Sequence, residues 1–316
     1  MIAYIVRRLI QLPIILWVIY TLTFLLISLH PGNPFVGDKT TEIQKQFMAR
    51  RYGIVDRDTS DWKQWWADRA TTYANLLGRL VHGDLGPSSE FENRTVNDII
   101  AASLPRSVLL GVFALMLAVV VGCTLGIVAA VKSHSSVDYA VMLYALAGIS
   151  LPLFVIGAML LSFFAFTLAW FPVGGWGRPS QLILPGVTLS LPFTAYVARL
   201  MRAGMLDVLH ADFIRTARAK GLPARQVIFK HAFKLSFLPV LSFLGPATAA
   251  ILTGSFVVEK IFNVPGMGAA FVTSVNSKDY GLILGTVLVY SSLLVVANLV
   301  VDVAYAWVDP RIHLEG

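Results

Sequence analysis

Long apolar runs recur along the chain, separated by segments richer in polar residues. Crossing about 30 Å of hydrocarbon takes about 20 mostly apolar residues in a helix. Six runs reach that length or more: Leu9–Leu29, Val108–Val131, Ala140–Trp170, Leu182–Met201, Leu235–Val258 and Leu282–Val301. The pattern predicts an all-α integral membrane protein with six transmembrane helices. Arg7 and Arg8 precede the first run as they would in a signal peptide, but its length predicts a retained helix.

The runs divide the chain into three predicted parts: a first transmembrane helix over 1–30, an external segment over 31–103 and a five-helix core over 104–316. Orientation follows from the Lys and Arg residues of the short loops. With the N-terminus inside, twelve of them lie on the inner side, against Arg178, Lys260 and Lys278 outside. Residues 30–106 carry the other ten, offset by ten acids, and long loops cross largely regardless of charge. We expect both termini inside.

Composition supports a membrane protein and excludes several other classes. Hydrophobic residues make up 56% of the 316 and charged residues 14%, against about 25% charged in soluble domains. This excludes a soluble enzyme, a disordered chain and a secreted scaffold. The net charge of +7 indicates basic inner loops, with no nucleic-acid partner expected. The single Cys123 lies in an apolar run and excludes a disulfide framework.

The spans carry little chemistry of their own. Residues 126–133 imitate a phosphate-binding loop but lack its second glycine, and the six histidines have no metal-ligand spacing. Few charges fall at span centres, which argues against an ion-coupled secondary transporter, and no nucleophile motif suggests an intramembrane enzyme. Gly122-x-x-x-Gly126 and Gly281-x-x-x-Gly285 favour close helix packing. We expect a transport subunit that binds no metal or cofactor and receives energy from a partner.

A basic inner loop over residues 199–234 is the first candidate site. It holds eight Lys or Arg residues and two acids, Asp207 and Asp212. Asp212 is predicted to cap a short helix over Phe213–Lys220, and Gly221 to end it. Pro223 can open the next helix at its first turn. A generic positive-inside anchor is the alternative, but the capped geometry favours a docking element.

The faces of this short helix are predicted from its spacing. Phe213 and Ala217 lie one turn apart on one face, and Arg215 and Arg218 share another. The second candidate site is the last outer loop, Glu259–Gly281. Its turn-forming residues allow it to enter the external mouth as a gate, or to be a plain surface turn. The gate residues would be Glu259, Pro265, Gly266 and Gly268.

The run Asp212-Phe-Ile-Arg-Thr-Ala-Arg-Ala-Lys-Gly-Leu-Pro223 resembles the permease subunits of binding-protein-dependent peptide importers of the ATP-binding-cassette (ABC) class. In that family this motif forms the coupling helix, which docks in a groove of the ATPase. The family's Glu-Ala-Ala is here Arg215-Thr216-Ala217, and Gly221 keeps the family's glycine. These departures are shared by the peptide and nickel branch. The resemblance implies a coupling helix at about 212–221, formed by Asp212, Phe213, Arg215, Thr216, Ala217, Arg218, Ala219, Lys220 and Gly221.

Further motifs extend the resemblance along the chain. They are Arg7-Arg8-Leu9, Pro31-Gly32-Asn33-Pro34, His82-Gly83-Asp84-Leu85-Gly86, Glu259-Lys-Ile-Phe, Pro265-Gly266-Met-Gly268 and Asp302…Asp309-Pro310-Arg311. Three others are most similar to the B subunits of oligopeptide permeases: Gly86-Pro87-Ser88, Val96-Asn97-Asp98 and Ser103-Leu104-Pro105.

The resemblance implies a type I ABC importer permease fold, multi-pass in the bacterial plasma membrane. It also implies a homologous second permease, two ATP-binding subunits that use ATP and Mg, an external solute-binding protein, a peptide substrate and surrounding lipid. Cargo stays open within the class: dipeptides, nickel, glutathione or cell-wall peptides are alternatives to oligopeptides.

Overall fold

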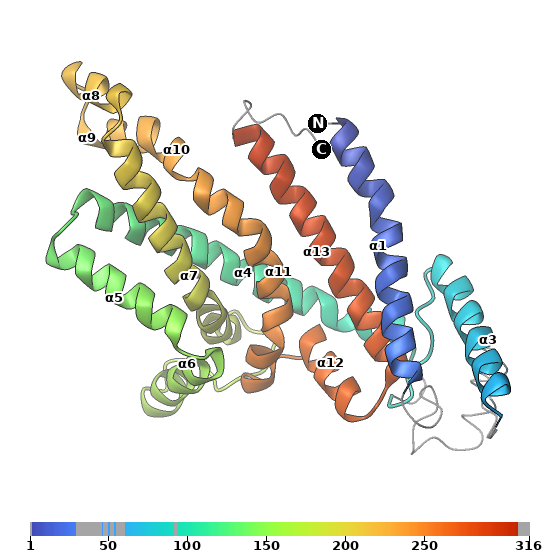
Figure 1. Ribbon diagram of the computed structural model, residues 1–316. Helices are drawn as coiled ribbons and strands as arrows, with labels where there is room; N and C mark the ends of the chain where they lie inside the picture. The colour runs from blue at the N-terminus through green and yellow to red at the C-terminus, as the bar shows by residue number, and fades with distance from the viewer. Residues whose placement is uncertain are drawn as a thin grey trace. The chain divides into compact units, whose positions relative to one another are not determined.

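The computed structural model describes residues 2–29, 46, 50, 54, 61–91 and 94–308; the side chains at 2–6, 9, 249, 253–255 and 304–308 are outside the description. Within these residues the regular elements are helices, and one isolated bridge pairs Pro87 with Thr95. In chain order (Figure 1) the helices are α1 (Ile2–Ser28), α3 (Trp62–Val81), α4 (Val96–Val131), α5 (Ser136–Ser150), α6 (Leu153–Leu160), the π-helix η1 (Leu161–Thr167), α7 (Ser180–Leu209), α8 (Asp212–Ala219), α9 (Ala224–Gln226), the π-helix η2 (Val227–Ala232), α10 (Phe233–Ser236), α11 (Leu238–Ile261), α12 (Met267–Asn276) and α13 (Tyr280–Val308).

Five described helices are long and apolar enough to cross a membrane: α1, α4, α7, α11 and α13. The predicted run Ala140–Trp170 is instead split into α5 and the α6–η1 pair, which are bent by 110° and make a sixth span only if counted together. The cause is Pro152, which disfavours the helical conformation at the residue before it. Leu151 accordingly has extended dihedrals, φ −81° and ψ 132°.

The described chain forms two compact units. The first contains residues 1–8, 108–264 and 294–316, and the second contains 9–107 and 265–293. The division predicted at residues 30 and 103 is based on where the chain crosses the membrane, whereas these two units are defined by packing. The predicted division therefore stays a prediction. The motifs Pro31–Pro34 and Asp309–Arg311 lie outside the described residues.

In the first unit, α4 packs closely against α7 through its two glycines. A Cβ atom added to Gly122 would lie 2.7 Å from Val197 Cβ, and one added to Gly126 would lie 2.6 Å from the carbonyl oxygen of Ala198. Since Cβ contacts below 3.0 Å essentially never occur, only glycine allows this approach. The predicted packing role of Gly122-x-x-x-Gly126 is confirmed.

In the second unit, α3 packs on α1. The backbone N–H of Lys63 donates to the carboxylate of Asp61, which caps α3. The buried Leu76 shares a core cluster with Tyr20 and Phe24 of α1, and the hydroxyls of Thr21 and Tyr73 lie 2.7 Å apart. Helix α3 therefore packs on a neighbouring helix.

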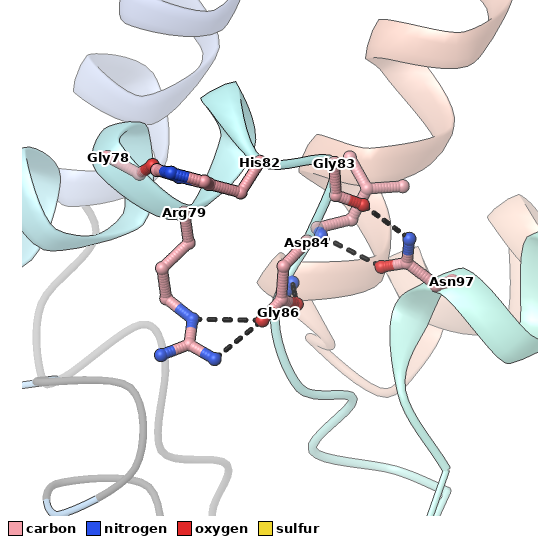
Figure 2. A network of polar contacts seen from close by, with 8 residues as sticks. Gly78, Arg79, His82, Gly83, Asp84, Gly86 and Asn97 are labelled. Atoms are coloured by element: carbon pink, nitrogen blue, oxygen red, sulfur yellow. Dashed lines mark hydrogen bonds and ion pairs between the residues drawn. The ribbon is translucent and has the colours of Figure 1, made fainter.

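The motif His82-Gly83-Asp84-Leu85-Gly86 follows α3. Its hydrogen bonds to Arg79 of α3 and Asn97 of α4 form a polar clasp between α3 and the start of α4 (Figure 2). Arg79 Nε donates to Asp84 over 3.0 Å, and the other carboxylate oxygen of Asp84 accepts from Gly86 N–H at 3.0 Å. Asn97 on α4 accepts from Leu85 N–H at 2.8 Å and donates to the Gly83 carbonyl at 2.6 Å. Gly83 and Gly86 have φ of +78° and +94°, where glycine is favoured. The polar residues of this motif therefore have a structural role.

Candidate functional site

Helix α8 has a defined end at Gly221. The residue has φ +75°, and its N–H donates to the Arg218 carbonyl at 2.9 Å. The Leu222 N–H reaches back to the Ala217 carbonyl at 3.4 Å. Together these bonds form a Schellman motif, which satisfies carbonyls that the helix end leaves unpaired. The predicted glycine stop is confirmed, and it fixes where the chain leaves α8.

The start of α8 differs from the prediction. The capping position belongs to Ala211, and no side-chain cap is formed. Asp212 is already the first helical residue, so the predicted Asp212 cap is wrong. Its side chain is 98% exposed, with the carboxylate 3.6 Å from Arg215. An acid in the first turn still interacts favourably with the helix dipole. Pro223 is likewise the cap of α9 and not its first-turn residue.

Two faces of α8 have different environments. Ile214 is fully buried and Ala217 is buried, in a cluster that includes Met201 and Met205 of α7. Phe213 is 43% exposed. Phe213 and Ala217, predicted one turn apart on one face, therefore have different environments. The i, i+3 spacing of Ile214 and Ala217 is the sequence signal that marks the packed face.

The remaining candidate residues of α8 are all exposed: Asp212, Arg215, Thr216, Arg218, Ala219, Lys220 and Gly221. Figure 1 shows α8 and α9 beyond the end of α7. The surface offered here combines an exposed aromatic ring with several cations.

Beyond Asp212, the charge around α8 is positive. No acid occurs between Asp212 and Glu259, whereas Lys or Arg occurs at 215, 218, 220, 225, 230 and 234. A surface hollow of about 620 Å³ lies next along the chain, lined by Pro223, Arg225, Gln226, Phe229 and Lys230. In the described part of the chain, Arg225 and Lys230 have no ion-pair partner. The surface is suited to a partner that presents acidic and apolar groups.

Asp138 near the start of α5 is a buried residue that the sequence analysis did not single out. Its side chain is 3% exposed and forms a two-pronged ion pair with Arg202 of α7, at 2.6 and 2.7 Å. No local pattern indicates this pair, because 64 residues separate its members.

The second candidate site is more ordered than the predicted loop. Glu259 is fully buried near the end of α11, and its carbonyl accepts from Val264 N–H at 2.8 Å. Pro265 is exposed, Gly266 caps α12 and Gly268 is buried within it. The segment is therefore largely helical, and whether it acts as a gate stays a prediction.

The start of α12 is fastened to the first part of α4. Arg106 donates to the Pro265 carbonyl at 3.0 Å, and Met267 N–H donates to the Ser107 hydroxyl at 2.7 Å. At the other end of α12, the buried Asp279 accepts from Ser88 Oγ at 2.5 Å and from Leu282 N–H at 3.1 Å. Both ends of α12 are therefore held by hydrogen bonds within the second unit.

The geometry offers surfaces for partners, and no group of three metal-binding side chains is found in the described residues. The model of the family described as "Binding-protein-dependent transport system inner membrane component" matches residues 122–314. The chain belongs to this family. This permease is therefore a membrane component of a binding-protein-dependent transport system, with several helices able to span the membrane.

Relatives match the permease along its whole length. It is 42% identical over 317 residues to the oligopeptide transport system permease protein OppB of Salmonella typhimurium, covering 99% of this chain and 100% of that protein. OppB of Escherichia coli K12 is 41% identical with the same coverage. The dipeptide transport system permease protein DppB of Bacillus subtilis is 39% identical over 98% of each chain.

A solved structure shares the fold. The MetNI methionine ABC transporter, in an inward-facing conformation, matches with a TM-score of 0.51 and 14% sequence identity, over 67% of this chain and 96% of that one. This likeness confirms the predicted ABC importer permease fold.

Proposed function

We propose that this permease forms half of the translocation path of an ATP-driven importer that carries oligopeptides across the bacterial plasma membrane. The full-length identity to OppB proteins supports this cargo. The similar identity to DppB of Bacillus subtilis makes dipeptides the second candidate. In either case the permease has no ATPase site of its own.

The partners follow from the transport class. A homologous second permease completes the path, two ATP-binding subunits use ATP and Mg at the inner face, and an external solute-binding protein delivers the peptide. The N- and C-termini lie inside in this arrangement, as the distribution of Lys and Arg indicates. Glu259, Pro265, Gly266 and Gly268 then belong to the external mouth.

Helix α8 is the proposed contact with one ATPase. The observation that carries the proposal is its two-sided character, with Ile214 fully buried and Phe213 exposed among cations. A helix fixed on one side to α7 can transmit a push received on the other side. The exposed ring supplies contact area that is desolvated on docking, and such rings dominate many interfaces.

The test combines assembly with uptake. Phe213→Asp places a carboxylate where the docking surface needs an apolar group, so we expect loss of ATPase co-purification and of ATP-dependent peptide uptake into proteoliposomes. Ala70→Asp, at an exposed position on α3, is the control and should leave both unchanged. Wild-type levels of both in Phe213→Asp would refute the docking proposal. Uptake of dipeptides but not of longer peptides by the wild-type importer would show that dipeptides, and not oligopeptides, are the cargo.

A further inference from the structure

We infer that Asp138 is a positioning residue for coupling: its ion pair with Arg202 makes α5 move with α7 when α8 is pushed. The inference rests on the proposed docking of an ATPase at α8. It concerns how the motion spreads from α8 within the first unit, which neither the family nor the relatives' names describe.

Three hydrogen bonds converge on the Asp138 carboxylate. Arg202 donates through Nε and Nη2 at 2.6 and 2.7 Å, and the backbone N–H of His134 donates at 3.0 Å. Bidentate pairs of this kind fix geometry as well as adding energy, because both planes must align. One carboxylate therefore joins α7 to the α4–α5 turn, in which His134 has φ +61°.

The ion pair belongs to the same packed body as α8. Arg202 lies on the part of α7 that touches Gly126 of α4, where an added Cβ atom would be 3.0 Å from Arg202 N. The cluster that buries Ile214 also contains Ile127 of α4 and Met201 of α7. Arg202 lies seven positions before Leu209, the last residue of α7, which is about 10 Å of helical rise. A push on α8 therefore reaches α7 and α4 through apolar contacts.

Apolar packing also holds α5 on α7: Val141 of α5 and Ala198 of α7 are buried in one cluster. Along this contact, a Cβ atom added to Gly148 would lie 3.1 Å from Ala195 Cβ, so small residues face each other. The bidentate ion pair adds a directional constraint to this packing, because its geometry fixes how α5 is aligned with α7. Buried ion pairs add little net stability relative to apolar replacements, and their best-attested use is to fix register.

The experiment separates positioning from folding. Asp138→Asn keeps the side-chain size but removes the charge and one acceptor, and Asp138→Arg with Arg202→Asp reverses the pair. Each complex, with its ATPases and binding protein, is reconstituted in proteoliposomes. We measure the ATP hydrolysed per peptide transported, together with ATPase retention on purification. Arg199→Gln is the matched control, because Arg199 is an exposed cation on α7 one turn earlier.

We expect Asp138→Asn to retain its ATPases and to raise the ATP consumed per peptide at least about fivefold, the lower end of typical coupling between sites. The reversed pair should recover most of this loss, and Arg199→Gln should resemble wild type. A normal ratio in Asp138→Asn would overturn the inference. So would loss of ATPase retention without recovery in the reversed pair, which would indicate a folding role only. If the wild-type permease itself retains no ATPase, the proposed function fails, whatever Asp138 does.

Discussion

Alanine at Ile214 or at Phe213 should affect α8 in two distinguishable ways. Both residues are large and apolar, and they are adjacent in the chain, but Ile214 is fully buried while Phe213 is 43% exposed. Replacing a fully buried isoleucine by alanine costs about 2–5 kcal/mol, because transfer and cavity terms add. Removing the Phe213 ring, which is only partly covered, should cost about 1 kcal/mol of folding free energy.

Two measurements on the purified permease pair separate these effects. The first is the midpoint of thermal unfolding in detergent, followed by tryptophan fluorescence, and the second is ATPase retention at graded ATPase concentrations. We expect Ile214→Ala to lower the midpoint clearly. We expect Phe213→Ala to leave the midpoint almost unchanged and to weaken ATPase binding by about 2 kcal/mol or more, as for a hot-spot residue.

The reverse pattern would refute the reasoning. If Phe213→Ala lowered the midpoint as much as Ile214→Ala while its remaining folded fraction bound the ATPase normally, the exposed ring would be a folding residue. Equal, small effects of both variants would show that α8 is neither packed nor docked as described.

Three further substitutions and one control test the packing within each of the two units. Gly126→Val should lower the free energy of unfolding by about 1–3 kcal/mol through overpacking against α7. The control Gly78→Ala should be neutral or slightly stabilising, because a Cβ atom added there has nothing within 4 Å. Equal losses in the two variants would contradict the close approach of α4 and α7. Asp279→Asn should speed proteolysis of residues 82–91, since Asp279 accepts from Ser88, and an unchanged cleavage rate would argue against a stabilising role of this hydrogen bond. Asn97→Ala should destabilise by about 1–3 kcal/mol by leaving backbone groups of the clasp unpaired, measured as the shift in unfolding midpoint; no shift would show that water replaces the amide.

The sequence predicted those features whose cause is local. Apolar runs of sufficient length predicted the spans, because helix rise and bilayer thickness leave little freedom. Gly221 was predicted as a helix end because its backbone conformation favours glycine. The break at Leu151 also has a local cause in Pro152, but a proline does not by itself determine the 110° angle between the pieces.

Features that depend on tertiary packing were either not predicted from the sequence or predicted wrongly. Asp212 is a strong capping residue by type, yet Ala211 takes that position. The burial of Ile214 and Ala217 depends on α7 and η2, which the spacing of α8 alone does not place. The Asp138–Arg202 pair joins residues far apart in sequence, as does the bond from Ser88 to Asp279. Neither could be derived from one chain without its fold.

Site-specific photo-crosslinking at position 213 tests the central claim most directly. A photo-reactive phenylalanine analogue replaces Phe213 in cells that express the whole importer, and another replaces the exposed Trp170 as control. The account predicts that position 213 forms a crosslink to an ATPase subunit, identified by mass spectrometry, and that position 170 does not. A crosslink from position 213 only to other parts of this permease or to lipid would contradict it.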